Sequence, residues 1–300
     1  MGHSTSGRRR PHRIKRAALS AARVRAWIRT QLSEALESLG AHAPADVEIH
    51  AARKSIKRAR AGLRLLRDML TRAAYERENR ALRDAGRPLS PARDTRILLD
   101  VLESLAAKRS VDPASCKSLK QALIRRRGQL ERRAVARHEI VAVRRALREV
   151  DHRIQRWSFA GADASLLLRS LRRIYRRGQH AMSAARQDGR APVLHEWRKE
   201  VKYLWHALQI LPMQTSAAPR ADVAHKLADH LGDDHDLAIL HDYLLARRKL
   251  LSRAAAKTLN AEIGKRRLAL ERKAFALGRR LFREKPRKFA TRFERLRPRA

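Results

Sequence analysis

The chain has 300 residues, and its 44% hydrophobic and 33% charged residues favour a folded helical protein over a disordered one. Seventy Lys and Arg residues against 30 Asp and Glu residues give a formal net charge of +40, which destabilises a compact monomer unless anions are bound. The charge therefore predicts a polyanionic partner, and by itself leaves nucleic acid, polyphosphate and an acidic membrane open.

Cysteine content and hydropathy narrow the class of protein further. Cys116 is the one cysteine, so the chain has no intramolecular disulfide and no Cys-based zinc site. The sequence has no run of about 18 apolar residues, so no membrane span is predicted. Basic residues near the N-terminus are not followed by an apolar stretch, which argues against a secretory signal peptide and favours a cytoplasmic location.

The first half of the chain is predicted to be helical after a basic arm. Residues 1–14 are rich in Gly, Ser and Arg and are expected to be disordered. Apolar residues at helical spacing, with breakers between them, then predict a series of helices. These cover residues 17–39, 46–70 and 72–83, a stretch between Pro91 and Pro113, and residues 115–156.

The second half repeats this plan after a candidate linker at residues 157–162. Its predicted helices cover residues 163–186, 192–211, a short stretch ending at His230, 236–251 and 254–285. Gly232 is expected to end the short helix, and residues 286–300 are expected to form a basic tail. Strict apolar alternation and Asn-Gly turns are missing from the sequence, so an all-α protein is predicted.

One stretch of eight residues occurs twice, 145 residues apart. His, Arg, Lys and Lys stand at offsets 0, 3, 4 and 7 in both copies, which places them on one face of a helix. The opposite face is apolar in each copy, so both helices are amphipathic. The residues are His50, Arg53, Lys54 and Lys57 in the first copy, and His195, Arg198, Lys199 and Lys202 in the second.

A second pair of stretches follows in the same order. Residues 89–102 and 231–244 share six identities in register, including two Asp residues. Chance similarity between two Leu-rich helices explains the Leu matches, but it does not explain the shared His, Arg, Lys and Asp. The sequence therefore predicts an internal duplication.

The first copy carries an uninterrupted run of positive charge. From His50 to Arg67 there are seven basic residues and no acidic ones. Clustered like charges destabilise a bare helix, which is relieved if an anion binds. Arg forks and Lys point charges suit a row of phosphate oxygens, although a solvated face is the alternative. Five of the residues form a cationic stripe about 20 Å long on the His50 face: Arg53, Lys54, Lys57, Arg60 and Arg64.

The other polar residues are ambiguous. His50 and His195 suit either a phosphate contact or a buried bond between helices, and both roles stay open. Asp94, Asp100, Asp236 and Asp242 are interpreted as structural carboxylates, and Asp233 and Asp234 as cap or first-turn residues. The remaining histidines of the second half form no recognised metal motif: His180, His206, His225, His230 and His241. No metal site and no catalytic site are predicted.

The doubled motifs resemble those of the CHAD family, the conserved histidine α-helical domain. An H-x-x-R-x-x-x-[KR] helix, followed about forty residues later by an L-x-x-x-[RH]-D-x-x-[IV]-L helix, is typical of that family when the pair is doubled. The resemblance covers residues 15–285. It implies two helical bundles related by a pseudo-two-fold axis, residues 15–156 and 163–285, which together form one CHAD domain with a basic central cavity.

The resemblance also implies a function. It implies non-enzymatic binding of inorganic polyphosphate without a cofactor, and association with polyphosphate granules in the cytoplasm. The implied contacts are His50, Arg53, Lys54, Lys57, Arg60, Arg64, His195, Arg198, Lys199, Lys202 and His206. The second copy departs from the family pattern, because Tyr203 and Trp205 stand where the first has Arg58 and Arg60.

An enzyme that acts on polyphosphate and a nucleic-acid-binding protein are the two alternative functions. CHAD domains are sometimes joined to a triphosphatase domain, whose Glu-x-Glu-x-Lys strand is not in this sequence. A basic helical protein that binds nucleic acid is the alternative, and non-specific binding at low salt is expected in any case. Single-strand binders stack bases on aromatic rings, whereas only 4% of residues here are aromatic.

Overall fold

The structure is a computed structural model, and it describes residues 19–40, 44–89, 91–107, 116–132, 137–159, 164–211 and 217–294. Within these ranges every regular element is a helix, so the all-α prediction is confirmed. The predicted disordered arm lies outside them. The eleven α-helices of the described residues are α1 (Ala21–Ser38), α2 (Asp46–Leu65), α3 (Arg72–Ala85), α4 (Pro91–Ala107), α5 (Lys117–Arg132), α6 (Arg137–Gln155), α7 (Ala164–Gln187), α8 (Ala191–Ile210), α9 (Ala217–Leu245), α10 (Arg253–Leu281) and α11 (Pro286–Thr291).

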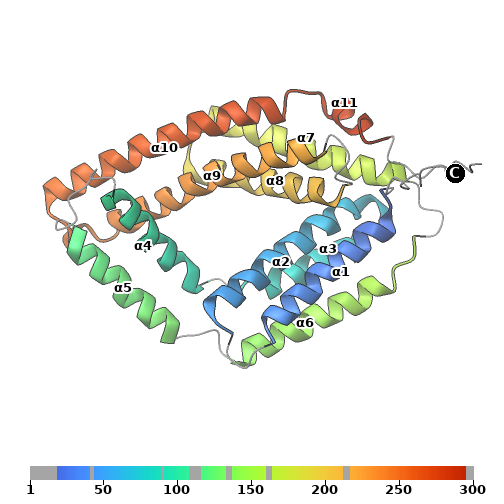
Figure 1. The fold of residues 1–300 in the computed structure, drawn as a ribbon, viewed down its shortest axis with the longest axis horizontal. Helices are drawn as coiled ribbons and strands as arrows, with labels where there is room; N and C mark the ends of the chain where they lie inside the picture. The colour runs from blue at the N-terminus through green and yellow to red at the C-terminus, as the bar shows by residue number, and fades with distance from the viewer. Residues whose placement is uncertain are drawn as a thin grey trace, which may run out of the picture.

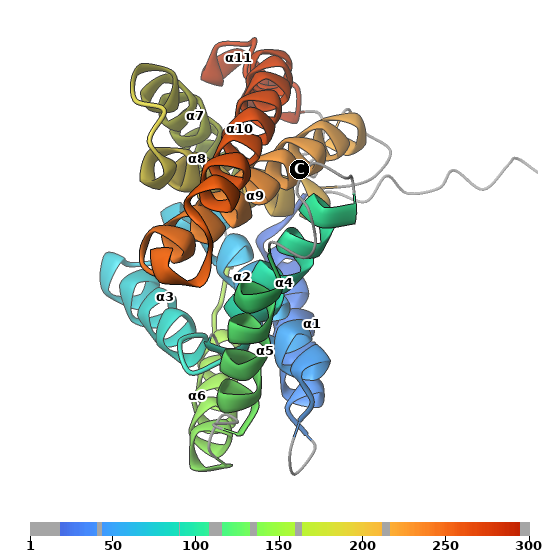
Figure 2. The ribbon, with the colours of Figure 1, turned by 90° about the vertical axis from the view of Figure 1, so that its left-hand side faces the viewer.

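The helices form two groups that meet along α2 and α8. Figure 1 shows α1, α2, α3 and α6 in one group and α7 to α11 in the other, and α2 packs against α8 where the groups join. The hairpin of α4 and α5 lies at one end of the molecule. The turn between α9 and α10 lies at the same end and faces this hairpin (Figure 1 and Figure 2). The two helices that carry the repeated motif are therefore central.

Apolar side chains form two cores, and both cross the boundary between the sequence halves. The larger core extends from Leu19 to Phe293 and takes in the apolar faces of α1, α2, α7 and α8. The smaller core joins α4 and α5 to the adjoining ends of α9 and α10. It includes Leu98, Leu102, Leu119, Leu123, Leu240, Tyr243, Leu259 and Ile263. The predicted units 15–156 and 163–285 thus share their cores.

Close packing of α1 on α2 fixes which side of α2 remains for other contacts. Val24, Ile28 and Leu32 recur every four residues along α1, and all three are fully buried. A Cβ atom at Gly62 of α2 would lie only 2.6 Å from Cγ1 of Ile28, so the helices approach here because this residue has no side chain. The apolar face of α2 is covered, and its basic residues lie elsewhere on the helix.

The single long helix predicted for residues 115–156 is two helices in the structure. The stretch 115–156 forms α5 and α6, on either side of residues 133–136, which are outside the described residues. α5 packs on α4 in the smaller core, whereas α6 packs on α1 and α3 in the larger one. Both segments have helical periodicity, so the pattern alone gave no sign that they bury their apolar faces in different cores.

Gly232 does not end a helix, contrary to the prediction. α9 continues through it without interruption from Ala217 to Leu245. A glycine inside a helix costs about 1 kcal/mol relative to alanine. Here the bare backbone makes room for Arg198 of α8, because a Cβ atom at position 232 would lie 2.9 Å from the Nη2 atom of Arg198.

The residues after α10 also differ from the predicted basic tail. Residues 286–291 form α11, which packs on α7. Phe289 and Phe293 are completely buried, and the ring of Phe289 stacks on that of Tyr175 with centroids 3.9 Å apart. Aromatic burial therefore ties this end of the chain to the larger core.

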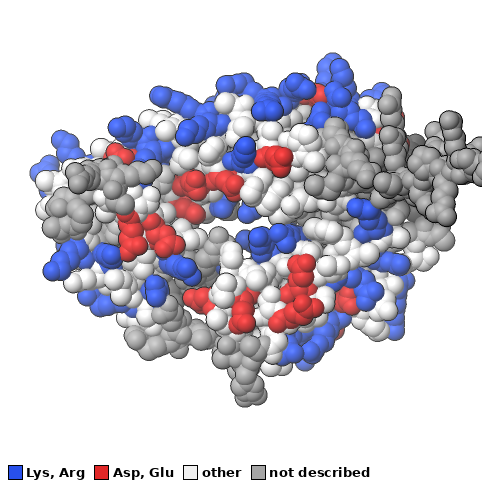
Figure 3. All heavy atoms as spheres, in the orientation of Figure 1, with Lys and Arg blue, Asp and Glu red and all other residues white. Residues whose placement is uncertain are grey.

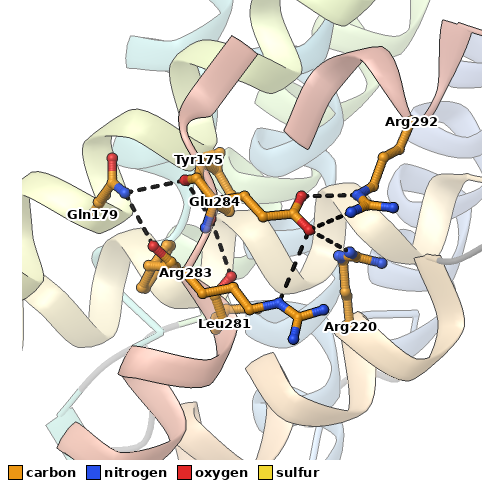
Figure 4. A network of polar contacts seen from close by, with 8 residues as sticks. Tyr175, Gln179, Arg220, Leu281, Arg283, Glu284 and Arg292 are labelled. Carbon is orange, nitrogen blue, oxygen red and sulfur yellow. Dashed lines mark hydrogen bonds and ion pairs between the residues drawn. The ribbon is translucent and has the colours of Figure 1, made fainter. Parts of the chain in front are cut away.

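A polar network completes this attachment, and we call Tyr175, Arg220, Glu284 and Arg292 the C-terminal clasp (Figure 4). Arg292 donates to both carboxylate oxygens of Glu284 at 2.8 and 2.6 Å, and Arg220 donates at 3.4 Å. Burial raises the pKa of Tyr175 to about 12, so its hydroxyl keeps its proton at neutral pH. That hydroxyl lies 3.1 Å from the carbonyl oxygen of Glu284.

No helix in the described part of the chain combines the length and the apolar character needed to cross a membrane.

Candidate anion-binding site

The two copies of the motif form helices in matching register. α2 and α8 each have 20 residues, and His50 and His195 are each the fifth residue of their helix. Every residue of α2 that is buried has a buried counterpart 145 positions later in α8. The same helical face is therefore turned inward in both, and the His, Arg and Lys residues of the motif occupy the same remaining face.

The cationic faces of α2 and α8 approach each other. Burial lowers the pKa of His195 on α8, and the charges of Arg198, Lys199 and Lys57 lower it further. Burial lowers the pKa of His206 to about 4, with added effects from Lys202 on the same helix and Arg58 and Lys54 on α2. Positive charges from α2 thus act on both histidines of α8.

The motif residues lie near a hollow on the surface and differ in their exposure to solvent. Figure 3 shows a hollow in the centre of this face, between the two helix groups, bordered by Lys and Arg atoms and also by Asp and Glu atoms. Lys54, Lys57 and Lys199 are exposed, while His50, Arg53, His195, Arg198 and Lys202 are half-buried. Lys199 also pairs with Glu196. These residues combine access to a ligand with partial exclusion of water.

Arg64 marks the contact between the two helices. Its Nη1 atom lies 3.6 Å from a carboxylate oxygen of Glu200 on α8, and its guanidinium carbon lies 3.6 Å from the centre of the Tyr203 ring. Glu200 is 2% exposed and also accepts a hydrogen bond from Arg177 of α7 at 2.8 Å. Cation–π contact and ion pairing hold Arg64 at this position.

Two of the predicted polyphosphate contacts, Arg60 and His206, point away from the space between α2 and α8 or are enclosed by neighbouring residues. Arg60 donates two hydrogen bonds to Asn79 of α3, at 3.2 and 3.1 Å, so its guanidinium is on the α3 side of the helix. His206 is 4% exposed, and its Nδ1 atom lies 3.0 Å from the amide oxygen of Gln209. With a pKa of about 4, His206 is neutral at neutral pH and braces the end of α8.

A pair of histidines lies beside the motif. The rings of His195 on α8 and His235 on α9 have centroids 4.2 Å apart. Arg198 packs against the backbone of α9 at Gly232, next to this pair. His235 was not in the predicted set, although it stands at the [RH] position of the second motif, which was a signal that could have included it.

The acidic residues of α9 do not form the predicted caps. Because α9 is continuous, Asp233 and Asp234 are interior helical residues. Asp234 is 1% exposed and accepts a hydrogen bond from Arg267 of α10 at 2.8 Å, so it pairs with a neighbouring helix instead of capping its own. Asp233 and Asp236 line a groove of about 540 Å³ with Asp100 of α4. No group of three or more His, Cys, Asp and Glu residues suited to a metal ion occurs among the described residues.

Comparison with known proteins identifies the family. A sequence model of the CHAD domain matches residues 30–245, and the chain belongs to the CHAD family. The crystal structure of the CHAD domain from the plant Ricinus communis is similar, with a TM-score of 0.53 and 17% sequence identity. The alignment covers 95% of this chain and 94% of that one, and at this identity it supports the fold alone. No curated protein matches the chain.

Proposed function

We propose that this chain binds inorganic polyphosphate between the cationic faces of α2 and α8 and catalyses no reaction on it. One observation carries the proposal: Lys57 of α2 and Arg198 and Lys199 of α8 all act electrostatically on His195, so cations of the two helices lie around one side chain. Like charges brought together from two helices are unfavourable unless an anion lies among them. Family membership points to the same ligand.

The proposed contacts differ in their chemistry. Arg53, Arg64 and Arg198 offer planar forks that can take two phosphate oxygens at once, and the lysines offer point charges. A linear polyphosphate has no bases and presents only a repeating row of anionic oxygens, so it needs no aromatic platform. The full set comprises His50, Arg53, Lys54, Lys57, Arg58, Arg64, His195, Arg198, Lys199 and Lys202. Arg60 and His206 contribute through packing.

The proposal includes an internal duplication and a shared basic cavity. The matching helix lengths and the matched buried residues of α2 and α8 support a common origin for the two motif copies. In this interpretation, each copy contributes one wall of the cavity. A thin, flexible anion fits between two helices, whereas a DNA duplex is too broad to enter.

A competition experiment tests the ligand. Purified protein is loaded with labelled long-chain polyphosphate, and unlabelled duplex DNA is added over a series of salt concentrations. We expect polyphosphate to remain bound at moderate salt, where DNA no longer competes, because DNA binding depends on counterion release. Equal competition at every salt concentration would mean that net charge alone governs binding and would favour the nucleic-acid alternative.

The proposal extends to location. A chain that binds long polyphosphate with this selectivity would associate with polyphosphate granules. A fluorescent fusion should accumulate on granules and disperse when polyphosphate is hydrolysed in the cell. A fusion that keeps the same distribution with and without granules would contradict this part of the proposal.

A further inference from the structure

The histidine pair beside the motif lies where α8 packs against α9. His195 of α8 and His235 of α9 are half-buried, and their rings are tilted by 35° with centroids 4.2 Å apart. Arg198 reaches the same place from α8, against the bare backbone of Gly232. Two imidazoles and a guanidinium therefore converge where α8 meets α9, next to the proposed polyphosphate site.

Both imidazoles are neutral in the unliganded protein at neutral pH. Burial lowers the pKa of His235 to about 4, and His195 and Arg198 lower it further. Burial likewise lowers the pKa of His195, with Arg198 as the next cause. The Nδ1 atom of His195 is buried and has no hydrogen-bond partner in the described part of the chain. A buried polar atom in that condition is costly, and a bound acceptor would relieve the cost once the ring is protonated.

The surrounding cations disfavour the protonated form of His195, and a bound anion would offset this effect. Lys57 of α2 and Lys199 of α8 act on His195 in the same direction as Arg198, and only Glu196 opposes them. Glu196 is itself paired with Lys199. Asp233 of α9 acts electrostatically on Arg198 and so faces the subsite from α9. It also lines a groove with Asp236, Asp100 of α4 and Arg266 and Lys273 of α10.

The internal alignment of the sequence adds an independent observation. His235 and Asp236 align with Arg93 and Asp94 of the first copy, 142 positions earlier. The first copy therefore has a permanent cation at the position where the second has an imidazole. A positive charge at this position is compatible with the motif, and the second copy makes that charge dependent on pH.

We propose that His195 and His235, together with Arg198, form an anion subsite that takes up protons as it binds polyphosphate, so that affinity rises as pH falls. This inference rests on the proposed function. A phosphate chain beside the pair favours the imidazolium forms, which then donate hydrogen bonds to its oxygens. His235 is thus a binding residue of the second copy, and the subsite makes the two copies respond differently to pH.

Calorimetric titration of the whole protein with long-chain polyphosphate tests the subsite. The internal phosphates of a long chain stay ionised throughout, so the ligand contributes little to the pH dependence. At constant ionic strength we expect binding roughly tenfold tighter at pH 5.5 than at pH 8, since each proton taken up contributes up to tenfold per pH unit. Repeating the titration in buffers of different ionisation enthalpy should show net proton uptake.

Variants assign the protons to the pair. His235→Asn should lose most of the pH dependence, because its largest loss of affinity is expected at pH 5.5, where the wild-type ring is protonated in the complex. His235→Arg should bind tightly at both pH values, as the first copy is expected to do. His180→Asn, which changes an exposed histidine of α7, is the matched control and should behave like the wild type. If a variant does not fold, the histidine proton signals of the wild type, titrated with and without polyphosphate, report the same pKa change.

The outcomes separate the two proposals. Binding of equal strength at pH 5.5 and pH 8, without proton uptake, would overturn the subsite and leave the proposed function intact. A pH dependence that persists in His235→Asn would also overturn it. Failure of the wild type to bind polyphosphate at either pH would overturn the proposed function itself and the subsite with it.

Discussion

The two motif helices have the same buried face and different cationic faces. The eight buried residues of α2 all have buried counterparts in α8, at Ala52 and Trp197, Ser55 and Glu200, Ile56 and Val201, Ala59 and Leu204, Ala61 and His206, Gly62 and Ala207, Leu63 and Leu208, and Leu65 and Ile210. Buried position is thus retained through changes as large as alanine to tryptophan. What fills each position depends on the neighbouring helix.

The neighbours account for the larger side chains of α8. α2 packs so closely on α1 that Gly62 touches Ile28, and small residues are needed there. Trp197 of α8 instead stacks on Phe275 of α10, with ring centroids 5.0 Å apart. A larger part of the surface of α8 is therefore buried against neighbouring helices. Its counterpart, with no acidic residue from His50 onward, is specialised for positive charge.

The largest effect should come from the face that the helices share. Leu63 and Leu208 occupy equivalent positions and are 0% and 1% exposed. Alanine at either position should lower the free energy of unfolding by about 2–5 kcal/mol, through lost burial and the cavity left behind. Chemical denaturation of both single variants gives the values. A large effect at one position and none at the other would show that the two helices are not packed equivalently.

A smaller loss is expected where the buried faces differ in charge. Glu200 is buried between Arg64 and Arg177, whereas its counterpart Ser55 donates a hydrogen bond to Glu34 at 3.0 Å. Glu200→Gln leaves two guanidinium groups without their anion and should cost about 1–3 kcal/mol, discounted because Arg177 is partly exposed. Ser55→Ala should cost about 1 kcal/mol or less. Equal costs in denaturation would contradict this difference.

The cationic faces should contribute unequally to ligand affinity. Replacing Arg53 and Lys57 together with Gln should weaken polyphosphate binding by about tenfold, because two charge-assisted contacts are lost while helix propensity is kept. The same change at Arg198 and Lys202 should weaken it less, because α8 carries fewer cations. Equal losses, or a larger loss from the α8 pair, would reverse the assignment.

A matched control and a stability measurement accompany these variants. Lys265 and Arg272 are exposed on α10, away from the motif helices, and their replacement with Gln removes the same charge. This control should change affinity only slightly. Melting temperatures should stay close to wild type for the α2 pair. The α8 pair should lower the melting temperature somewhat, because Arg198 packs against Gly232.

The smallest effect concerns the C-terminal clasp, which belongs to the second group of helices. Hydrogen bonding from Arg292, aided by the charge of Arg220, holds the pKa of Glu284 below its usual 4.5. The stability from Glu284 is therefore present above pH 4.5 and is lost as pH falls through the lowered value. Glu284→Gln should melt at a lower temperature than wild type at pH 7, and the difference should shrink near pH 3. Glu294→Gln, an exposed control, should show no such convergence.

Sequence periodicity was sufficient for the helical class, for most of the helices and for the buried face of each motif helix. The buried faces at Leu63 and Leu208 follow from the spacing of apolar residues, as predicted. Three features depended on tertiary partners instead. The break between α5 and α6 reflects two separate cores, the continuity of α9 through Gly232 reflects packing of Arg198, and α11 forms because Phe289 and Phe293 find a site on α7. None of these partners is near in sequence.

In the candidate site, too, some features follow from sequence periodicity and others depend on neighbouring helices. The offsets of the motif predicted one cationic face on α2, and in the structure Lys54, Lys57 and Arg64 of that face interact with residues of α8. The offsets could not show that Arg60 turns to Asn79 or that His206 is enclosed, because both depend on neighbouring helices. The position of His235 in the second motif was a signal of its importance, but its contact with His195, 40 residues away in the sequence, could not be predicted from periodicity.

The smaller core has a consequence for synthesis on the ribosome. Its members on α4 and α5, such as Leu98 and Leu119, are covered by residues of α9 and α10 as far along as Ile263. A nascent chain that has completed the first half therefore displays an apolar hairpin whose covering residues on α9 and α10 follow only after about a hundred residues of further translation. Such a surface is prone to aggregate or to recruit chaperones. Vectorial folding of this chain consequently ends with the closing of the hairpin onto the last long helices.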